Sequence, residues 1–202
     1  VGTVFGTNVS VNARIGTSPF SLEADMAIGA FNVGPVKLDE TRMGIKVSPT
    51  DNYISFAGGV TIGNTKVSVS GKAGANTTDG PYLDMTGSIS NLVIVPSFLE
   101  VSNAQVTMNL KPLRGVANIV ASGNFNILGS PGAVALNMQM SNYQLQSLTA
   151  SLQTRRTIAS IVTIDGTFNI AYSKGAAPTL DFNAVASVAG YALGTATGRI
   201  DG

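Results

Sequence analysis

The sequence predicts an all-β protein of roughly a dozen mostly antiparallel strands, in a sandwich or an elongated stacked or folded sheet built from divergent repeats. Apolar and polar residues alternate over segment after segment, as they do in half-buried strands. Short clusters of Gly, Pro, Asn and Ser separate these segments. No segment shows a 3.6-residue apolar period, so helical crossovers are not expected and neighbouring strands should pair antiparallel.

The clearest strand covers residues 161–172. Val162 and Ile164 begin a series of apolar residues on one side of the extended chain, while Thr163 and Asp165 begin a polar series on the other. Its β-branched residues also favour a strand over a helix.

The N-terminal half alternates in the same way. A turn at Thr17-Ser18-Pro19 separates the first two strands, and Gly63-Asn64 is typical of a tight hairpin. The polar, glycine-rich segment 71–81 is predicted to be the most exposed loop. The strands expected here are residues 4–15, 20–33, 36–38, 43–47, 54–62 and 67–69.

The C-terminal half begins with an alternating segment that Pro96 ends, and Lys111-Pro112 ends the next one. Each later segment is bounded by Gly, Pro, Asn or Ser. The strands expected here are residues 83–95, 104–110, 116–128, 133–140, 145–153, 158–172, 179–189 and 191–200.

A short motif, Gly-x-Phe-Asn-[Val/Ile], occurs three times. Each Gly shares a face with its Phe, which leaves room for the ring, so the Gly and Phe are expected in the core. The Asn points the other way. The last two copies lie within segments 115–157 and 158–202, which we interpret as divergent repeats. The motif residues are Gly29, Phe31, Asn32, Gly123, Phe125, Asn126, Gly166, Phe168 and Asn169.

Two regions are expected to share one continuous core. An N-terminal β region covers residues 1–97, and a C-terminal β region with the two repeats covers residues 98–202. No apolar run is long enough for a membrane-spanning helix.

The composition argues against catalysis and against nucleic-acid binding. The chain has no Cys and no His, which removes the usual zinc ligands and the commonest general base, so we expect no enzyme, no metal and no cofactor. Only 11% of the residues are charged, and 12 Lys and Arg nearly balance 11 Asp and Glu. A basic footprint for nucleic acid is therefore missing.

Two charged pairs are the remaining candidates for chemistry. Glu23 and Asp25 share one face of a strand, where they are a possible acid–base pair or, more simply, part of a solvated face. The adjacent Arg155 and Arg156 either bind an anion or keep a strand edge solvated.

The alternating strands and the Gly-x-Phe-Asn-Ile recurrence resemble repeating β modules of bacterial lipid-transport bridges and of very large secreted repeat proteins. The resemblance covers mostly residues 83–202. It implies binding of acyl chains along an apolar face, without catalytic residues, and a periplasmic location if the lipid-groove interpretation holds.

We expect a non-catalytic structural or adhesive β protein, extracellular or on the cell surface, that associates with itself or with other surface proteins. Low charge favours such association, because few charges need to be desolvated. The main alternative is a lipid-binding or lipid-transport protein with an apolar β-groove. A third is a carbohydrate-binding domain in which Tyr53, Tyr82 and Tyr143 stack on sugars.

Overall fold

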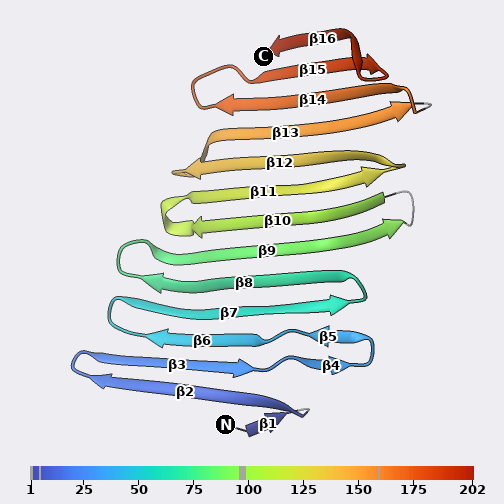
Figure 1. Ribbon diagram of the computed structural model, residues 1–202. Coiled ribbons are helices and arrows are strands. Elements are labelled where there is room, and N and C mark those ends of the chain that lie inside the picture. Colours follow the sequence, from blue (N-terminus) through green and yellow to red (C-terminus); the bar gives the residue numbers. More distant parts are fainter. Residues whose placement is uncertain (1, 5, 96–98, 159) are drawn as a thin grey trace.

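The computed structural model describes residues 2–4, 6–95, 99–158 and 160–202, which form one antiparallel sheet of 16 strands (Figure 1). The all-β class and the antiparallel pairing that the sequence predicts are confirmed. The first eight strands are β1 (Gly2–Val4), β2 (Thr7–Thr17), β3 (Phe20–Ile28), β4 (Phe31–Val33), β5 (Val36–Leu38), β6 (Thr41–Val47), β7 (Asp51–Ile62) and β8 (Thr65–Asn76). The other eight are β9 (Gly80–Val95), β10 (Leu99–Lys111), β11 (Val116–Ile127), β12 (Ser130–Ser141), β13 (Gln144–Ile158), β14 (Val162–Ser173), β15 (Thr179–Val188) and β16 (Tyr191–Asp201).

The strands follow one another in space as they do in the chain. β1, β2, β3 and then β6 to β16 are hydrogen-bonded in sequence order, and every pairing is antiparallel. The short hairpin of β4 and β5 lies beside this path, and β5 pairs with the C-terminal end of β7. The result is a long meander in which each strand contacts mainly its chain neighbours.

The sheet is a single layer. A second sheet does not cover either face within the described residues, so of the expected architectures the elongated sheet forms and the sandwich does not. Tyr82, 9% exposed, is the one apolar residue among those described that counts as buried. The alternation of half-buried strands is the same in both architectures, which is why the sequence left them open.

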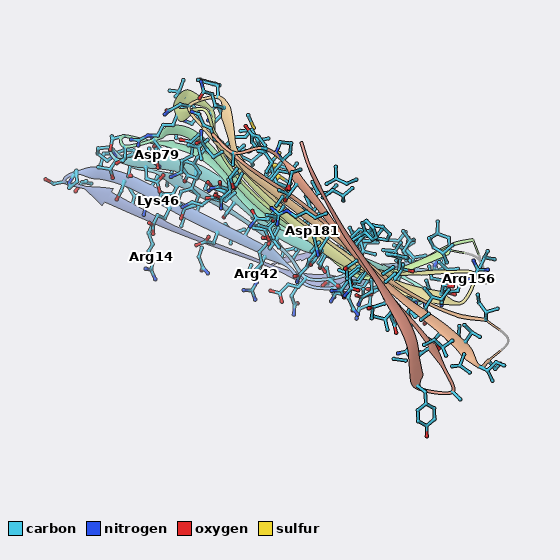
Figure 2. The ribbon with its side chains drawn as sticks, turned by 90° about the horizontal axis from the view of Figure 1, so that it is seen from above. Arg14, Arg42, Lys46, Asp79, Arg156 and Asp181 are labelled. Carbon is cyan, nitrogen blue, oxygen red and sulfur yellow. The ribbon has the colours of Figure 1, made fainter. Side chains whose placement is uncertain are left out.

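The sheet twists from its first strand to its last. Figure 2 shows it from above, with the N-terminal strands and the C-terminal strands running at different angles. This is the accumulated strand-to-strand rotation that is normal for antiparallel sheets.

Tight turns join most of the strands. Leu128 and Gly129 between β11 and β12 have φ values of 51° and 75°, and Asn142 and Tyr143 between β12 and β13 have 51° and 60°. Positive φ at both central residues is the conformation of hairpin turns whose twist matches the strands. These turns fix the register from strand to strand.

The predicted loop at 71–81 is wrong, because β8 continues to Asn76. Gly71 pairs with Phe56 and Gly74 pairs with Tyr53. A large aromatic residue opposite each glycine provides the side-chain surface that the glycine lacks. A second difference follows β10, where Pro112–Arg114 form a short 3₁₀ helix.

The expected boundary at residues 97 and 98 lies outside the described residues. β9 and β10 on either side of it are paired, so both regions belong to one sheet. The two expected repeats contain β11 to β13 and β14 to β16. Their origin as divergent copies stays a prediction.

Candidate functional site: the apolar face of the sheet

The pairing register sorts the side chains onto two chemically different faces, because directly paired residues of neighbouring strands share a face. We call them the apolar face and the polar face. The apolar face carries, among others, Val11, Ile15, Leu22, Met26, Ile45, Ile54, Val60, Val69, Met85, Met108, Ile119, Phe125, Leu136, Leu152, Ile164, Phe168, Ile170, Phe182 and Ile200.

One line of directly paired residues crosses the apolar face from β2 to β13 without a polar side chain and ends at Tyr172 in β14. Five of the six methionines of the chain belong to it, and we call it the methionine row. Methionine is flexible and polarisable, and it adapts to irregular apolar partners. In order, the row is Val11, Met26, Met43, Phe56, Gly71, Met85, Met108, Ile119, Met138, Leu148 and Tyr172.

The neighbouring line of paired residues, on the polar face, has the opposite character. We call it the polar row. In order it is Asn12, Asp25, Gly44, Ser55, Lys72, Asp84, Asn109, Asn118, Gln139, Ser147 and Ser173. Every member is charged, carries a hydroxyl or amide, or is glycine, so the two faces differ over the same span of strands.

The apolar face is open to solvent. Ile15 is 70% exposed, Ile54 is 52% exposed and Phe168 is 44% exposed. Soluble monomers rarely expose contiguous apolar patches larger than a few hundred square ångströms, and larger ones mark binding surfaces. A face of this kind that spans β2 to β16 is therefore the candidate functional site.

Phenylalanine rings on this face lie against glycines of the next strand. Phe56 pairs with Gly71, where an added Cβ would approach the ring to 2.7 Å. The pairs Phe125 with Gly132 and Phe182 with Gly198 are closer still. Because these glycines have no side chain, the rings can lie close to the backbone, which keeps the apolar face flat.

The three Gly-x-Phe-Asn motifs agree with this division of faces. Phe31, Phe125 and Phe168 all lie on the apolar face, in β4, β11 and β14. Their Asn neighbours lie on the polar face. Gly123 and Gly166 share the apolar face with their phenylalanines, whereas Gly29 lies between β3 and β4 and donates its backbone N–H to the Asn8 carbonyl at 2.9 Å. Phe168 packs beside Phe182 and Leu152, but on an open face and not in an enclosed core.

Ion pairs hold neighbouring strands together on the polar face. Lys46 Nζ lies 2.9 Å from Glu23 Oε1, and this hydrogen-bonded pair lowers the pKa of Glu23 and raises that of Lys46. At the strand ends drawn on the left of Figure 1, Asp79 accepts from Lys111 Nζ at 2.9 Å and lies 3.1 Å from Arg114 Nε. The hydrogen bond from Lys111 is the main reason why the pKa of Asp79 is lowered.

The tyrosines expected to stack on sugars have internal partners. Lys72 Nζ lies 3.7 Å above the Tyr53 ring and 5.6 Å from the Tyr82 ring, and Tyr82 donates its hydroxyl to Asp51 at 3.0 Å. Burial, followed by the hydrogen bond to Asp51, raises the pKa of Tyr82. Tyr143 donates its hydroxyl to the Pro112 carbonyl at 2.7 Å, bracing one turn against another.

The charged pairs singled out from the sequence are placed differently from each other. Glu23 is engaged by Lys46, while Asp25 lies two residues along the same strand without an ion pair to any described residue. Arg155 lies on the polar face, 3.5 Å from Asp165, but Arg156 lies on the apolar face opposite Ile164. The described residues contain no group of three Asp, Glu, His or Cys side chains suited to a metal.

A shallow hollow of about 710 Å³ lies on the polar face over β9 to β14. Asn91, Glu100, Asn124, Gln153, Arg155 and Asp165 are among its lining residues. None of the tyrosines lines it, so it gives no support to sugar stacking by Tyr53, Tyr82 or Tyr143.

Sequence reasoning found the alternation within each strand but not the methionine row or the phenylalanine–glycine pairs. Both depend on which residues lie opposite each other, and register is set by turn geometry that the sequence signals weakly. The spacing of the methionines along the chain gives no sign that they align across the sheet.

Comparison with known proteins adds no family assignment. No protein-family model matches the chain. Neither the curated proteins nor the solved structures give a significant match to it. Among the described residues, no helix is long and apolar enough to cross a membrane.

Proposed function

We propose that this protein binds lipid, with hydrocarbon tails lying on the apolar face of the sheet. The binding is non-catalytic, and the open face serves as a carrier surface or a track outside the cytoplasm. The observation that supports this most directly is the methionine row, which crosses from β2 to β13 without a polar group and ends at Tyr172 in β14.

Hydrocarbon is the occupant whose chemistry this face fits best. An acyl chain has no hydrogen-bonding groups to satisfy, and each methylene group removed from water contributes about 0.8 kcal/mol. Strands lie about 4.8 Å apart, so the eleven strands that the row crosses span roughly 50 Å. Such a length suits tails that lie side by side, or one lipid that moves along the sheet.

Photo-crosslinking at adjacent residues of β10 tests the proposal. We would replace Met108, on the apolar face, with p-benzoylphenylalanine, and make the matched variant at Thr107, which faces the other way. Irradiation of the full chain with phosphatidylcholine vesicles should attach lipid at position 108 and not at position 107, as measured by mass spectrometry.

Two outcomes would contradict the proposal. Equal labelling at both positions would show that contact with the vesicle is unspecific. Crosslinks at position 108 to a second copy of the chain, without lipid, would show that protein covers the apolar face.

Assembly into a larger structure, which the sequence favoured, is the second candidate, and the open edges of the sheet support it. β16 pairs only with β15, and β1 covers only the start of β2. Unpaired strand edges are templates for further strands. Sedimentation over a range of concentrations separates the candidates, since growing polymers are expected only if the edges pair.

A further inference from the structure

Arg156 is an exception to the division of the two faces. It pairs with Ile164, and Ile164 pairs with Ala186, so it lies on the apolar face. Every other charged strand residue in the described part of the chain lies on the polar face. Figure 2 shows Arg156 near the opposite end of the strands from Arg14 and Lys46.

The guanidinium of Arg156 has no partner within the described residues. No ion pair or hydrogen bond joins it to them, whereas its neighbour Arg155 pairs with Asp165 at 3.5 Å. Exposed aliphatic residues surround it, with Ile158 two positions along β13 and Ile164 opposite. A cation that becomes covered by hydrocarbon is costly unless an anion accompanies it.

The surface next to Arg156 is long enough for a lipid tail. From Arg156, this face of β13 continues through Thr154 and then through the apolar residues Leu152 and Ala150 to Leu148, about 27 Å along the strand. β14 lines the same path with Phe168 and Ile170. A charged group at one end of an apolar path has the polarity of an amphiphile.

We propose that the bound lipid has an anionic head group, which Arg156 holds near the end of β13 while the tails follow β13 and β14. A guanidinium binds phosphate or carboxylate oxygens through paired, charge-assisted hydrogen bonds. This inference rests on the proposed lipid binding and adds the class of lipid and its orientation.

The test compares two lipids on the wild-type chain and on variants of Arg155 and Arg156. Lysophosphatidylglycerol and lysophosphatidylcholine of equal chain length, below their micelle concentrations, are titrated into the wild-type chain, Arg156→Gln and Arg155→Gln. A charge-assisted hydrogen bond contributes about 1.5–3 kcal/mol, so Arg156→Gln should weaken binding of the anionic lipid by about tenfold or more. Binding of the zwitterionic lipid should change less, and Arg155→Gln should resemble the wild type.

The outcomes separate the two proposals. Binding of neither lipid to the wild type would overturn lipid binding itself. Equal binding of both lipids, or an equal loss in both variants, would overturn the role of Arg156 and leave lipid binding intact. If Arg156→Lys, unlike Arg156→Gln, again binds the anionic lipid better than the zwitterionic lipid, this would support a role for the charge at this position.

Discussion

The methionine row and the polar row run next to each other through the same strands, yet their side chains have different kinds of neighbours. On the polar face, Lys72 pairs with Asp84 in register and Asn109 contacts Asp84, so side chains satisfy one another across strands. On the apolar face, Met85 and Met108 pair with each other and with Gly71 and Ile119, none of which has a polar side chain. The polar face adds side-chain contacts between strands, whereas the apolar face stays open to solvent.

Among substitutions on the two faces, we expect the largest loss of unfolding free energy where a phenylalanine ring lies over a glycine. In Gly132→Ala the new Cβ would overlap the Phe125 ring and lie 2.6 Å from the Gln153 carbonyl oxygen. Overpacking of this kind costs typically about 1–3 kcal/mol of unfolding free energy. Denaturant unfolding monitored by circular dichroism measures it.

The matched control is Gly194→Ala, also on the apolar face, where an added Cβ has no atom within 4 Å. Its unfolding free energy should stay within about 0.5 kcal/mol of the wild type. Equal losses in both variants would show that glycine flexibility, and not space for a ring, explains the pairs.

A smaller loss is expected for Phe168→Ala. The sequence placed this ring in a core, where its removal costs about 3–5 kcal/mol. At 44% exposed and flanked by Phe182 and Leu152, it should contribute only about 1–2 kcal/mol to unfolding. The variant Thr167→Ala on the other face is the control. If Phe168→Ala instead lowers the unfolding free energy by about 3–5 kcal/mol, as for a core ring, another layer covers the apolar face in solution.

The smallest effect concerns acid stability on the polar face. Because Lys111 lowers the pKa of Asp79 in the folded state, the pair stabilises the fold above the unfolded pKa of about 3.8, and this contribution is lost as the pH falls through the folded pKa. Asp79→Asn should therefore lower the melting temperature slightly at neutral pH and flatten its fall below about pH 4. A pH profile of Asp79→Asn that falls as steeply as that of the wild type would contradict this role of the Asp79–Lys111 pair.

The sequence predicted the strands well because each strand carries its own alternation. Residues 161–172 have the same pattern whether a second sheet covers Phe168 or solvent reaches it, so the number of layers was not predictable. The split of Arg155 and Arg156 follows from alternation alone, but which arginine lies on the apolar face depends on the register of β13 with β14. Gly71 and Gly74 were misassigned to a loop because their strand character comes from Phe56 and Tyr53 opposite them.

The most direct test of the central claim is the lipid content of the chain purified without detergent, measured by solvent extraction and mass spectrometry against the protein concentration. If lipid tails bind to the apolar face, the purified chain should carry bound lipid in amounts comparable to the protein. The bound lipid should be lost in Met108→Asp and kept in Thr107→Asp. A monodisperse, lipid-free chain with the same melting temperature before and after extraction would contradict it.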